Sequence, residues 1–389
     1  MNLAVFFPEY EPLHCFKDPG QLVLGLNEIG CSSQLITTEK PSLRNHTAIP
    51  LRFATVDQMH DPGYWSRLEF DAIIAYTWLR PEFLWIVDTI KKGGKRLIVK
   101  ADTDGRLGFP VYPGWDRYIW NDLSIVSFLK ILRRRLRGRL RGRRHAALLS
   151  AHLGLANFVI VESPQALVNL TRILTHWRQP EHSDRILVIP NPVSTKVSQT
   201  PLTTKRRRIV AIGNWAMRFG NYQVKNPRML CKVLCRFLAS HQEYEAVIIG
   251  NGREVIERFL KAESPIPAGR VRITGPLDHD EVVQCLAESR MLFLPSLSEG
   301  FSIAASEALC LGCSVTGSPL ECLNYFSQGG FSGTLARGFG RDAYLEALSA
   351  DAAKWEIGAY SAEGISSFWR RRLNRGIIAS QFLELARRP

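Results

Sequence analysis

Short apolar runs alternate with segments of helical periodicity along most of the chain. In the N-terminal half, the apolar runs lie at residues 3–7, 33–37, 71–76, 96–100, 158–161 and 186–189, and helical patterns cover about 21–29 and 82–91. Apolar strands separated by helices are typical of a parallel, doubly wound sheet. This half of the chain therefore predicts one Rossmann-like domain.

The second half repeats the pattern after a polar, Thr-rich and Pro-containing segment at 194–205, which predicts a linker. Its apolar runs lie at residues 209–212, 246–249, 271–274 and 291–294, and a helical pattern follows at about 342–348. A chain of 389 residues is long enough for two such domains. We expect one domain at 1–195 and a second at 206–365.

The stretch from Met291 to Pro319 carries the most information about function. Its apolar run ends at Pro295, a polar turn follows, and Ser302 offers an N-cap to a small-residue helix at about Ile303–Leu311. Ligands of open α/β sheets sit outside the carboxyl ends of strands, where a helix N-terminus favours an anion. A phosphate group is the expected ligand of this strand, turn and helix.

Two carboxylates flank that predicted helix N-terminus. Glu299 lies in the turn before the helix, and Glu307 lies one turn inside it. Because a carboxylate accepts hydrogen bonds from neighbouring hydroxyls, one Glu would suit a ribose and the other a sugar, with a diphosphate between them. The alternative is that both are ordinary carboxylates near a helix start. Their spacing alone does not decide between these interpretations.

The surrounding residues form a longer motif: Pro295, Ser296, Glu299, Gly300, Phe301, Glu307, Ala308 and Gly312. This motif resembles the Glu-x7-Glu element of the retaining glycosyltransferases of family 4. The resemblance implies an α/β GT-B fold, with two Rossmann-like doubly wound domains facing a central cleft. The N-terminal domain would be the acceptor side and the second domain the nucleotide-sugar donor side. It also implies that a C-terminal helix at about 366–389 crosses back to the first domain.

The resemblance assigns roles to individual residues. Lys225 and an Arg after Gly213 would clamp the donor diphosphate; that Arg is displaced here, and Arg218 is the nearest candidate. Glu307 would hold the ribose, and Glu299 would hold the donor sugar. The remaining expected donor-binding residues are Gly20, Gly213, Gly252, Pro276, Leu277, Gly300, Phe301, Ser302, Ile303 and Ala304.

The strand at 96–100 ends in Ala-Asp-Thr-Asp-Gly, which allows two interpretations. Asp102 and Asp104 form an Asp-x-Asp pair that suggests a divalent metal, as in the other large fold of nucleotide-sugar transferases. In family 4 this strand end presents a His near the transferred sugar, and Asp102 takes its place here as a catalytic candidate. We expect no metal and no cofactor, because Lys225, Arg218 and the helix N-terminus would neutralise the leaving diphosphate.

Composition sets further limits on the chain. It is 46% hydrophobic, yet no apolar run reaches the length of a membrane span, and its start predicts a strand rather than a signal peptide. The eight cysteines are scattered, which predicts reduced, mostly buried thiols. Cys310 and Cys313 form a C-x-x-C without a second Cys or His pair nearby, so we do not expect zinc. A cytoplasmic location is expected.

The net charge of +14 is concentrated in one segment. Residues 130–144 hold Lys130 and eight arginines without an acidic residue, within a predicted helix at about 122–152 that has a leucine stripe. A basic amphipathic helix is typical of a membrane surface, so we expect residues 125–147 to contact an anionic membrane or a lipid-diphosphate acceptor. The alternatives are leucines packed on the sheet beneath solvated arginines, and nucleic acid, for which no binding module accompanies the run.

The sequence thus predicts a metal-independent retaining hexosyltransferase attached peripherally to the inner face of the membrane. Its donor would be a nucleotide diphosphate sugar, with UDP-glucose expected as the most frequent one and GDP-mannose next. Its acceptor would be a glycan or lipid-linked glycan of bacterial-type surface polysaccharide or glycolipid synthesis. The rival enzyme is a nucleotide-sugar epimerase of the same fold. The rival from another class is a basic nucleic-acid-binding protein.

Overall fold

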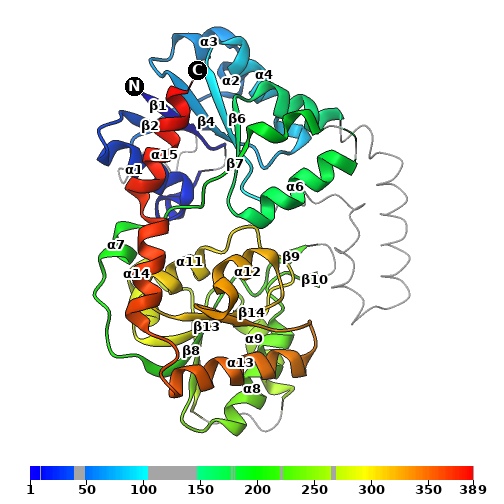
Figure 1. Cartoon of the computed structure of the whole chain (residues 1–389), viewed down its shortest axis with the longest axis vertical. Helices are drawn as coiled ribbons and strands as arrows, with labels where there is room; N and C mark the ends of the chain where they lie inside the picture. The colour runs from blue at the N-terminus through cyan, green and yellow to red at the C-terminus, as the bar shows by residue number, and fades with distance from the viewer. Residues whose placement is uncertain are drawn as a thin grey trace. The chain divides into compact units, whose positions relative to one another are not determined.

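The computed structural model describes residues 1–8, 10–38, 49–103, 147–176, 178, 180–219, 222–263 and 269–388. The chain forms two compact units (Figure 1). Unit 1 comprises Met1–Ser194 and Arg372–Pro389, and unit 2 comprises Thr195–Arg371. The basic run at 130–144 and Asp104 lie outside the described residues.

Unit 1 is built on a seven-stranded parallel sheet in the order β3-β2-β1-β4-β5-β6-β7. The strands are β1 (Leu3–Phe6), β2 (Ser33–Thr38), β3 (Leu51–Ala54), β4 (Ala72–Tyr76), β5 (Arg96–Lys100), β6 (Phe158–Val161) and β7 (Ile186–Val188). β3 was not predicted from the sequence. The strand order reverses between β1 and β4, which is where ligands of such sheets bind.

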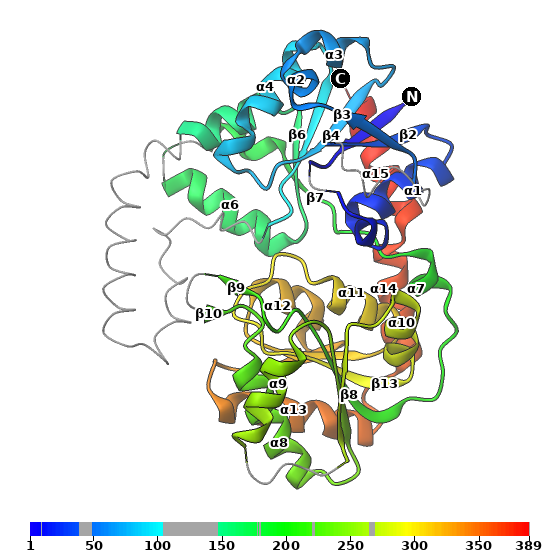
Figure 2. The ribbon, with the colours of Figure 1, turned by 180° about the vertical axis from the view of Figure 1, so that it is seen from behind.

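Helices cover both faces of this sheet. They are α1 (Asp18–Glu28), α2 (Val56–His60), α3 (Pro62–Arg67), α4 (Leu84–Lys92), α6 (Pro164–His176) and α15 (Arg375–Arg387), together with helical residues 147–155 and the 3-10 helices Pro12–Phe16, Pro81–Phe83 and Pro180–Arg185. One apolar cluster joins the sheet to α3, α4 and α6, and the other joins it to α1 and α15. Figure 2 shows α4 and α6 on the side of the sheet away from α1 and α15.

The C-terminal segment differs from the single helix predicted at about 366–389. It forms α14 (Ala362–Leu373) and α15, which are separated by Asn374. The Asn374 side chain accepts a hydrogen bond from the N–H of Ile377 and so begins a new helix. α15 packs on α1 at Gly25, where a Cβ atom would lie 2.6 Å from the carbonyl oxygen of Arg375. The last helix is therefore part of unit 1.

Unit 2 holds a six-stranded parallel sheet in the order β12-β11-β8-β13-β14-β15. The strands are β8 (Arg206–Ile212), β11 (Glu245–Ile249), β12 (Val271–Gly275), β13 (Ser289–Leu294), β14 (Ser314–Gly317) and β15 (Gly333–Leu335), with a small antiparallel hairpin of β9 (Arg218–Phe219) and β10 (Tyr222–Gln223). The strand order reverses between β8 and β13. The fold prediction of two parallel, doubly wound sheets is confirmed.

The helices of unit 2 are α7 (Thr195–Gln199), α8 (Pro227–Ser240), α9 (Arg253–Lys261), α10 (His279–Ala287), α11 (Ile303–Cys310), α12 (Glu321–Ser327), α13 (Arg341–Glu356) and most of α14. The segment predicted to be a linker joins the two units and contains α7, and α12 and β15 follow Pro319, where no element was predicted. These elements are short, so they leave little periodic signal in the sequence.

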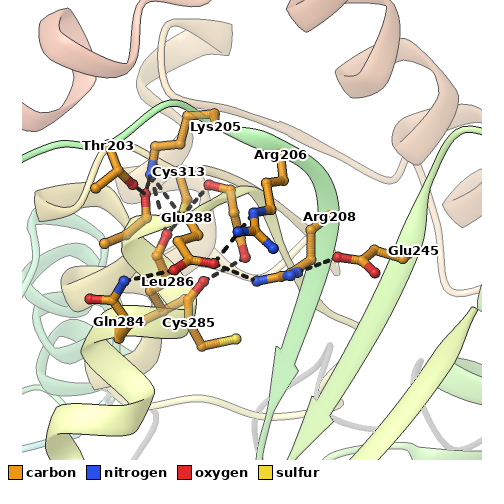
Figure 3. A network of polar contacts seen from close by, with 12 residues as sticks. Thr203, Lys205, Arg206, Arg208, Glu245, Gln284, Cys285, Leu286, Glu288 and Cys313 are labelled. Carbon is orange, nitrogen blue, oxygen red and sulfur yellow. Dashed lines mark hydrogen bonds and ion pairs between the residues drawn. The ribbon is translucent and has the colours of Figure 1, made fainter.

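A polar network fixes the amino end of β8 to the helices beside it (Figure 3). Lys205 Nζ donates to the carbonyl oxygens of Ala287, the last residue of α10, at 2.8 Å and of Leu311, the residue that follows α11, at 2.5 Å. A cation at these ends satisfies carbonyls that lack a helical partner and opposes the helix dipoles. Burial lowers the pKa of Lys205. The network anchors the end of α11 opposite its N-terminus.

All eight cysteines are free thiols with buried side chains, as predicted. Burial raises the pKa of both Cys310 and Cys313. A buried thiol with a raised pKa is a poor nucleophile and a poor metal ligand, so these cysteines serve as packing residues.

Candidate functional site

The N-terminus of α11 lies just after the carboxyl end of β13. The strand ends at Leu294, and Pro295, which has no N–H to donate to a sheet ladder, follows it. Ser302 is the N-cap, and its side chain accepts from the N–H of Ala305 at 3.4 Å. The first N–H groups of a helix have no intrahelical acceptor, so those of Ile303 and Ala304 are candidate anion donors. The predicted strand, turn and helix are present.

Lys225 and Glu299 meet at this strand end. Lys225 Nζ lies 2.6 Å from Glu299 Oε1, and the two side chains are 21% and 8% exposed. Asn226 fixes the Lys225 loop, because its side chain donates to the carbonyl oxygen of Pro295 at 3.2 Å. The N–H of Leu297 also donates to the carbonyl oxygen of Val224 at 2.8 Å. Two residues predicted for one site, 74 positions apart, are thus in direct contact.

Glu307 lies inside α11 and pairs with a residue that the sequence did not single out. His279 Nε2 is 2.9 Å from Glu307 Oε1, and both side chains are nearly buried. His279 is the first residue of α10, two positions after Leu277. The available signal was its place directly after the turn that follows β12, which holds the predicted donor-binding residues Pro276 and Leu277.

The turns after β8 and β11 approach each other backbone to backbone. A Cβ atom on Gly250, whose φ is +122°, would lie 1.9 Å from the carbonyl oxygen of Gly213. One on Gly213 would lie 3.2 Å from Lys225 Cγ. Gly252, the N-cap of α9, has φ +92°. Close packing therefore requires Gly250, and a Cβ atom on Gly252 would lie 2.6 Å from the backbone nitrogen of Ala216, whether or not a ligand binds there.

Two other predicted donor residues are not among these contacts. Arg218 begins β9, and its side chain lies outside the described side chains. Gly20 is in unit 1, where Asp18–Gly20 form the first turn of α1. A Cβ atom on Gly20 would lie 2.5 Å from Cys15 Cα, so its absence lets the preceding loop pack on α1. The ligand-binding role of Gly20 stays a prediction.

Unit 1 holds a second polar cluster, at the carboxyl ends of β5, β6 and β7. Lys100 is fully buried, and its Nζ lies 3.0 Å from Asp18 Oδ2, 3.1 Å from Glu162 Oε1 and 2.5 Å from Asn191 Oδ1. The Tyr76 hydroxyl donates to Asp18 Oδ2 at 2.6 Å. Sequence reasoning missed this cluster. The signal was a polar residue at or just after the end of each of three apolar runs.

Burial and charge act against each other in this cluster. Burial raises the pKa of Glu162 to about 7 although Lys100 lowers it, and burial also raises the pKa of Asp18. Burial lowers the pKa of Lys100, but the nearby carboxylates, led by Asp18 and Glu162, outweigh this effect and raise it. Lys100 is therefore the cation that holds these carboxylates in the interior.

Asp102 lies at the edge of this cluster, as predicted for the end of β5. Its Oδ2 accepts from Trp78 Nε1 at 3.2 Å, and its Oδ1 accepts a long hydrogen bond from Asn191 Nδ2 at 3.5 Å. Its own N–H donates to Glu162 Oε1 at 2.8 Å. The side chain is partly exposed. A carboxylate held in this way is available to a ligand hydroxyl.

Within the described ranges, no group of three or more His, Cys, Asp or Glu side chains would hold a metal ion. In the same part of the chain, no helix combines the length and the apolar character needed to span a membrane. The paired partner of Asp102 in the Asp-x-Asp interpretation, Asp104, lies outside the described residues.

Comparison with sequence families and known proteins gives partial matches to this chain. Residues 218–347, which carry Lys225, Glu299 and Glu307, match the family described as glycosyl transferases group 1. The GPI3 subunit of phosphatidylinositol N-acetylglucosaminyltransferase from Saccharomyces cerevisiae is 29% identical over 134 residues. That alignment covers 32% of this chain and 28% of the yeast protein, so the chain matches about a quarter of its relative's length.

Two solved structures are similar over nearly the whole chain. Anabaena Alr3699/HepE, in complex with UDP and glucose, superposes with a TM-score of 0.67 at 12% identity, covering 99% of this chain and 98% of that chain. Sucrose-phosphate synthase from Thermosynechococcus elongatus superposes with a TM-score of 0.66 at 16% identity, with the same 99% and 98% coverage. The chain therefore has the GT-B fold, and unit 2 carries the match to the group 1 glycosyl transferases.

Proposed function

We propose that this protein is a retaining glycosyltransferase that moves a sugar from a UDP-sugar, with glucose as the first candidate, to a glycan or lipid-linked acceptor. The observation that carries the proposal is the meeting of Lys225, Glu299 and the N-terminus of α11 at the switch point of the unit 2 sheet. A cation and free helix N–H groups at one place suit a diphosphate. The family match over the same residues supports it.

The donor would be held as follows. The Lys225 ammonium and the N–H groups of Ile303 and Ala304 would neutralise the charge that develops on the leaving diphosphate, and Arg218 is the candidate for a second cation. No metal ion would be needed for that task. Glu307, whose carboxylate is oriented by His279, would accept from the ribose hydroxyls. Pro276 and Leu277 would lie beside the base.

Glu299 would hold the hydroxyls of the donor sugar, assisted by the amides of Gly300, Phe301 and Ser302. Its ion pair with Lys225 would orient that carboxylate until the donor binds. Asp102 would serve the acceptor from unit 1. Retention would follow from attack by the acceptor on the face that the diphosphate leaves, without a protein nucleophile; a pair of carboxylates acting as in retaining glycosidases is the less favoured account.

The comparisons favour particular substrates. The Anabaena structure contains UDP and glucose, which supports a UDP-sugar and makes glucose the first donor to test. The yeast relative is named for transfer of N-acetylglucosamine to phosphatidylinositol, which supports a lipid-linked acceptor. The basic segment at 125–147 would bring such an acceptor to the enzyme by binding an anionic membrane surface at the cytoplasmic face.

One experiment separates this proposal from its rivals. The full chain is incubated with UDP-glucose, UDP-N-acetylglucosamine or GDP-mannose, with and without a lipid-diphosphate glycan, and released nucleotide and the product anomer are measured. A glycosyltransferase releases nucleotide in an acceptor-dependent way, and a retaining one keeps the anomeric configuration of the donor. An epimerase would change the sugar without any acceptor. Binding to nucleic acid without turnover of any donor would instead indicate a basic nucleic-acid-binding protein.

A further inference from the structure

Glu162 holds the backbone at the end of β5 through both of its oxygens. Oε1 accepts from the N–H of Asp102 at 2.8 Å, and Oε2 accepts from the N–H of Thr103 at 3.2 Å. The Glu162 side chain is only 1% exposed, so water competes little for these bonds. One carboxylate therefore fixes two successive peptide groups where the strand has already ended.

The backbone that Glu162 holds is in an uncommon conformation. Asp102 has φ +43°, in the left-handed region that residues with a side chain adopt only at an energetic cost. Such a conformation persists only where the surroundings impose it. Here it places the Asp102 carboxylate between Trp78 Nε1 and Asn191 Nδ2. The hydrogen bonds to Glu162 thus account for both the backbone conformation at Asp102 and the orientation of its carboxylate.

Lys100 makes this arrangement possible. A single buried carboxylate would protonate or draw in water, but Lys100 Nζ lies within 3.1 Å of both Asp18 and Glu162. Asn191 joins the two ends of the network, because its Oδ1 accepts from Lys100 at 2.5 Å while its Nδ2 donates to Asp102 at 3.5 Å. A charged cluster in the interior gives weak net stability compared with apolar packing. The cluster instead fixes the positions of the side chains that it joins.

We propose that Glu162, supported by Lys100 and Asn191, is a positioning residue that fixes the backbone at Asp102 and Thr103 and so aims the Asp102 carboxylate at an acceptor hydroxyl. This inference rests on the proposed function, in which Asp102 serves the acceptor. Glu162 itself does not touch the substrate. Its effect on transfer passes entirely through Asp102, and this distinguishes it from a residue that only stabilises unit 1.

The first test does not depend on activity. In Glu162→Gln, an amide nitrogen must face either Thr103 N–H or the donors Lys100 and Asp102 N–H, so at least one hydrogen bond is lost. Exchange in D₂O of at least one of the Asp102 and Thr103 amides should rise about tenfold or more. Glu28→Gln is the matched control, because Glu28 pairs with Arg375 on the surface of unit 1 and its loss should leave these amides protected. Unchanged protection in Glu162→Gln would overturn the inference.

A second variant guards against loss of the fold. If thermal unfolding shows that Glu162→Gln is not folded, Asn191→Ser is the second variant. It removes the bridge between Lys100 and Asp102 and leaves the Asp18 and Glu162 carboxylates in place. It should raise exchange at Asp102 in the same direction, by about threefold or more. Equal exchange in Asn191→Ser and the wild type would contradict the role given to the network.

The kinetic test is a double-variant cycle with Asp102→Asn. Glu162→Gln alone should lower kcat by about 10- to 100-fold, with the KM for the nucleotide sugar changed by less than about twofold, because the donor residues lie in unit 2. In the Asp102→Asn background it should lower kcat by less than about twofold more. If the fold reductions in kcat of the two single variants multiply in the double variant, Glu162 does not act through Asp102. A wild-type protein that transfers no sugar would refute the proposed function, while the exchange test would still decide whether Glu162 positions Asp102.

Discussion

Replacing Glu299 by glutamine tests the pairing at the centre of the proposed donor site. Lys225 Nζ lies 2.6 Å from Glu299 Oε1, so a diphosphate that binds Lys225 must draw it away from that carboxylate or share it. The side chains are 21% and 8% exposed, and solvent therefore screens the pair only partly. Glu299→Gln keeps the size of the side chain and removes its charge.

The magnitude follows from the two kinds of hydrogen bond involved. A bond to a charged partner contributes about 1.5 to 3 kcal/mol, and a neutral one contributes about 0.5 to 1.5 kcal/mol. Freeing Lys225 should therefore favour the diphosphate by about 1 to 2 kcal/mol, which tightens the Kd for UDP about 5- to 30-fold. Transfer should fall by about 10- to 100-fold, because glutamine holds the donor sugar's hydroxyls less strongly. Binding of the product and turnover would change in opposite directions.

Calorimetry with UDP and turnover of the sugar donor measure the two effects on the same preparations. Lys225→Ala should weaken UDP binding as well as transfer, because it removes the cation itself. Glu307→Gln should weaken UDP binding by about 1 to 3 kcal/mol if Glu307 holds the ribose. Glu245→Gln is the matched control, since Glu245 pairs with Arg208 at the amino end of β11. Weaker UDP binding by Glu299→Gln, or wild-type behaviour of both Glu variants, would refute the reasoning.

Three further predictions concern pH, metal and membrane. Burial lowers the pKa of His152 to about 4, below its unfolded value, so its contribution to stability is complete above about pH 6.5 and is lost as the pH falls towards 4. Chemical denaturation across this range should show the wild type losing about 3 kcal/mol more than His152→Gln, which would still bond Thr77; parallel curves would contradict the burial argument. Incubation with EDTA should leave transfer intact, and a loss that manganese restores would favour the Asp-x-Asp metal site instead. Replacing five arginines of the basic run by glutamine should weaken sedimentation with anionic vesicles, by about 1 kcal/mol for each charge near the surface, and wild-type binding should fall as salt rises; equal sedimentation would remove the membrane from the proposed function. The five are Arg133, Arg134, Arg135, Arg137 and Arg139.

Much of the fold follows from local pattern alone. β5 and β6 have the bounds that the sequence predicted, and α11 begins at the predicted Ile303, because an apolar run and a capping Ser act within a few residues. The two doubly wound sheets follow from the alternation of such runs with helices. The break of the last helix at Asn374 was missed, because the apolar stripe continues across the break and hides the cap.

The motif around Glu299 and Glu307 marked the candidate site, but it did not indicate what those carboxylates touch. Their partners, Lys225 and His279, lie just before α8 and at the start of α10, in segments that follow other strands. Only the order of strands in the sheet brings these segments together. The Lys100 cluster has the same origin, since β5, β6 and β7 are neighbours in space and their ends are separated by long stretches of chain. Local periodicity determines which residues form strands, whereas strand order and packing determine which polar strand ends share a low-dielectric interior and therefore pair with one another.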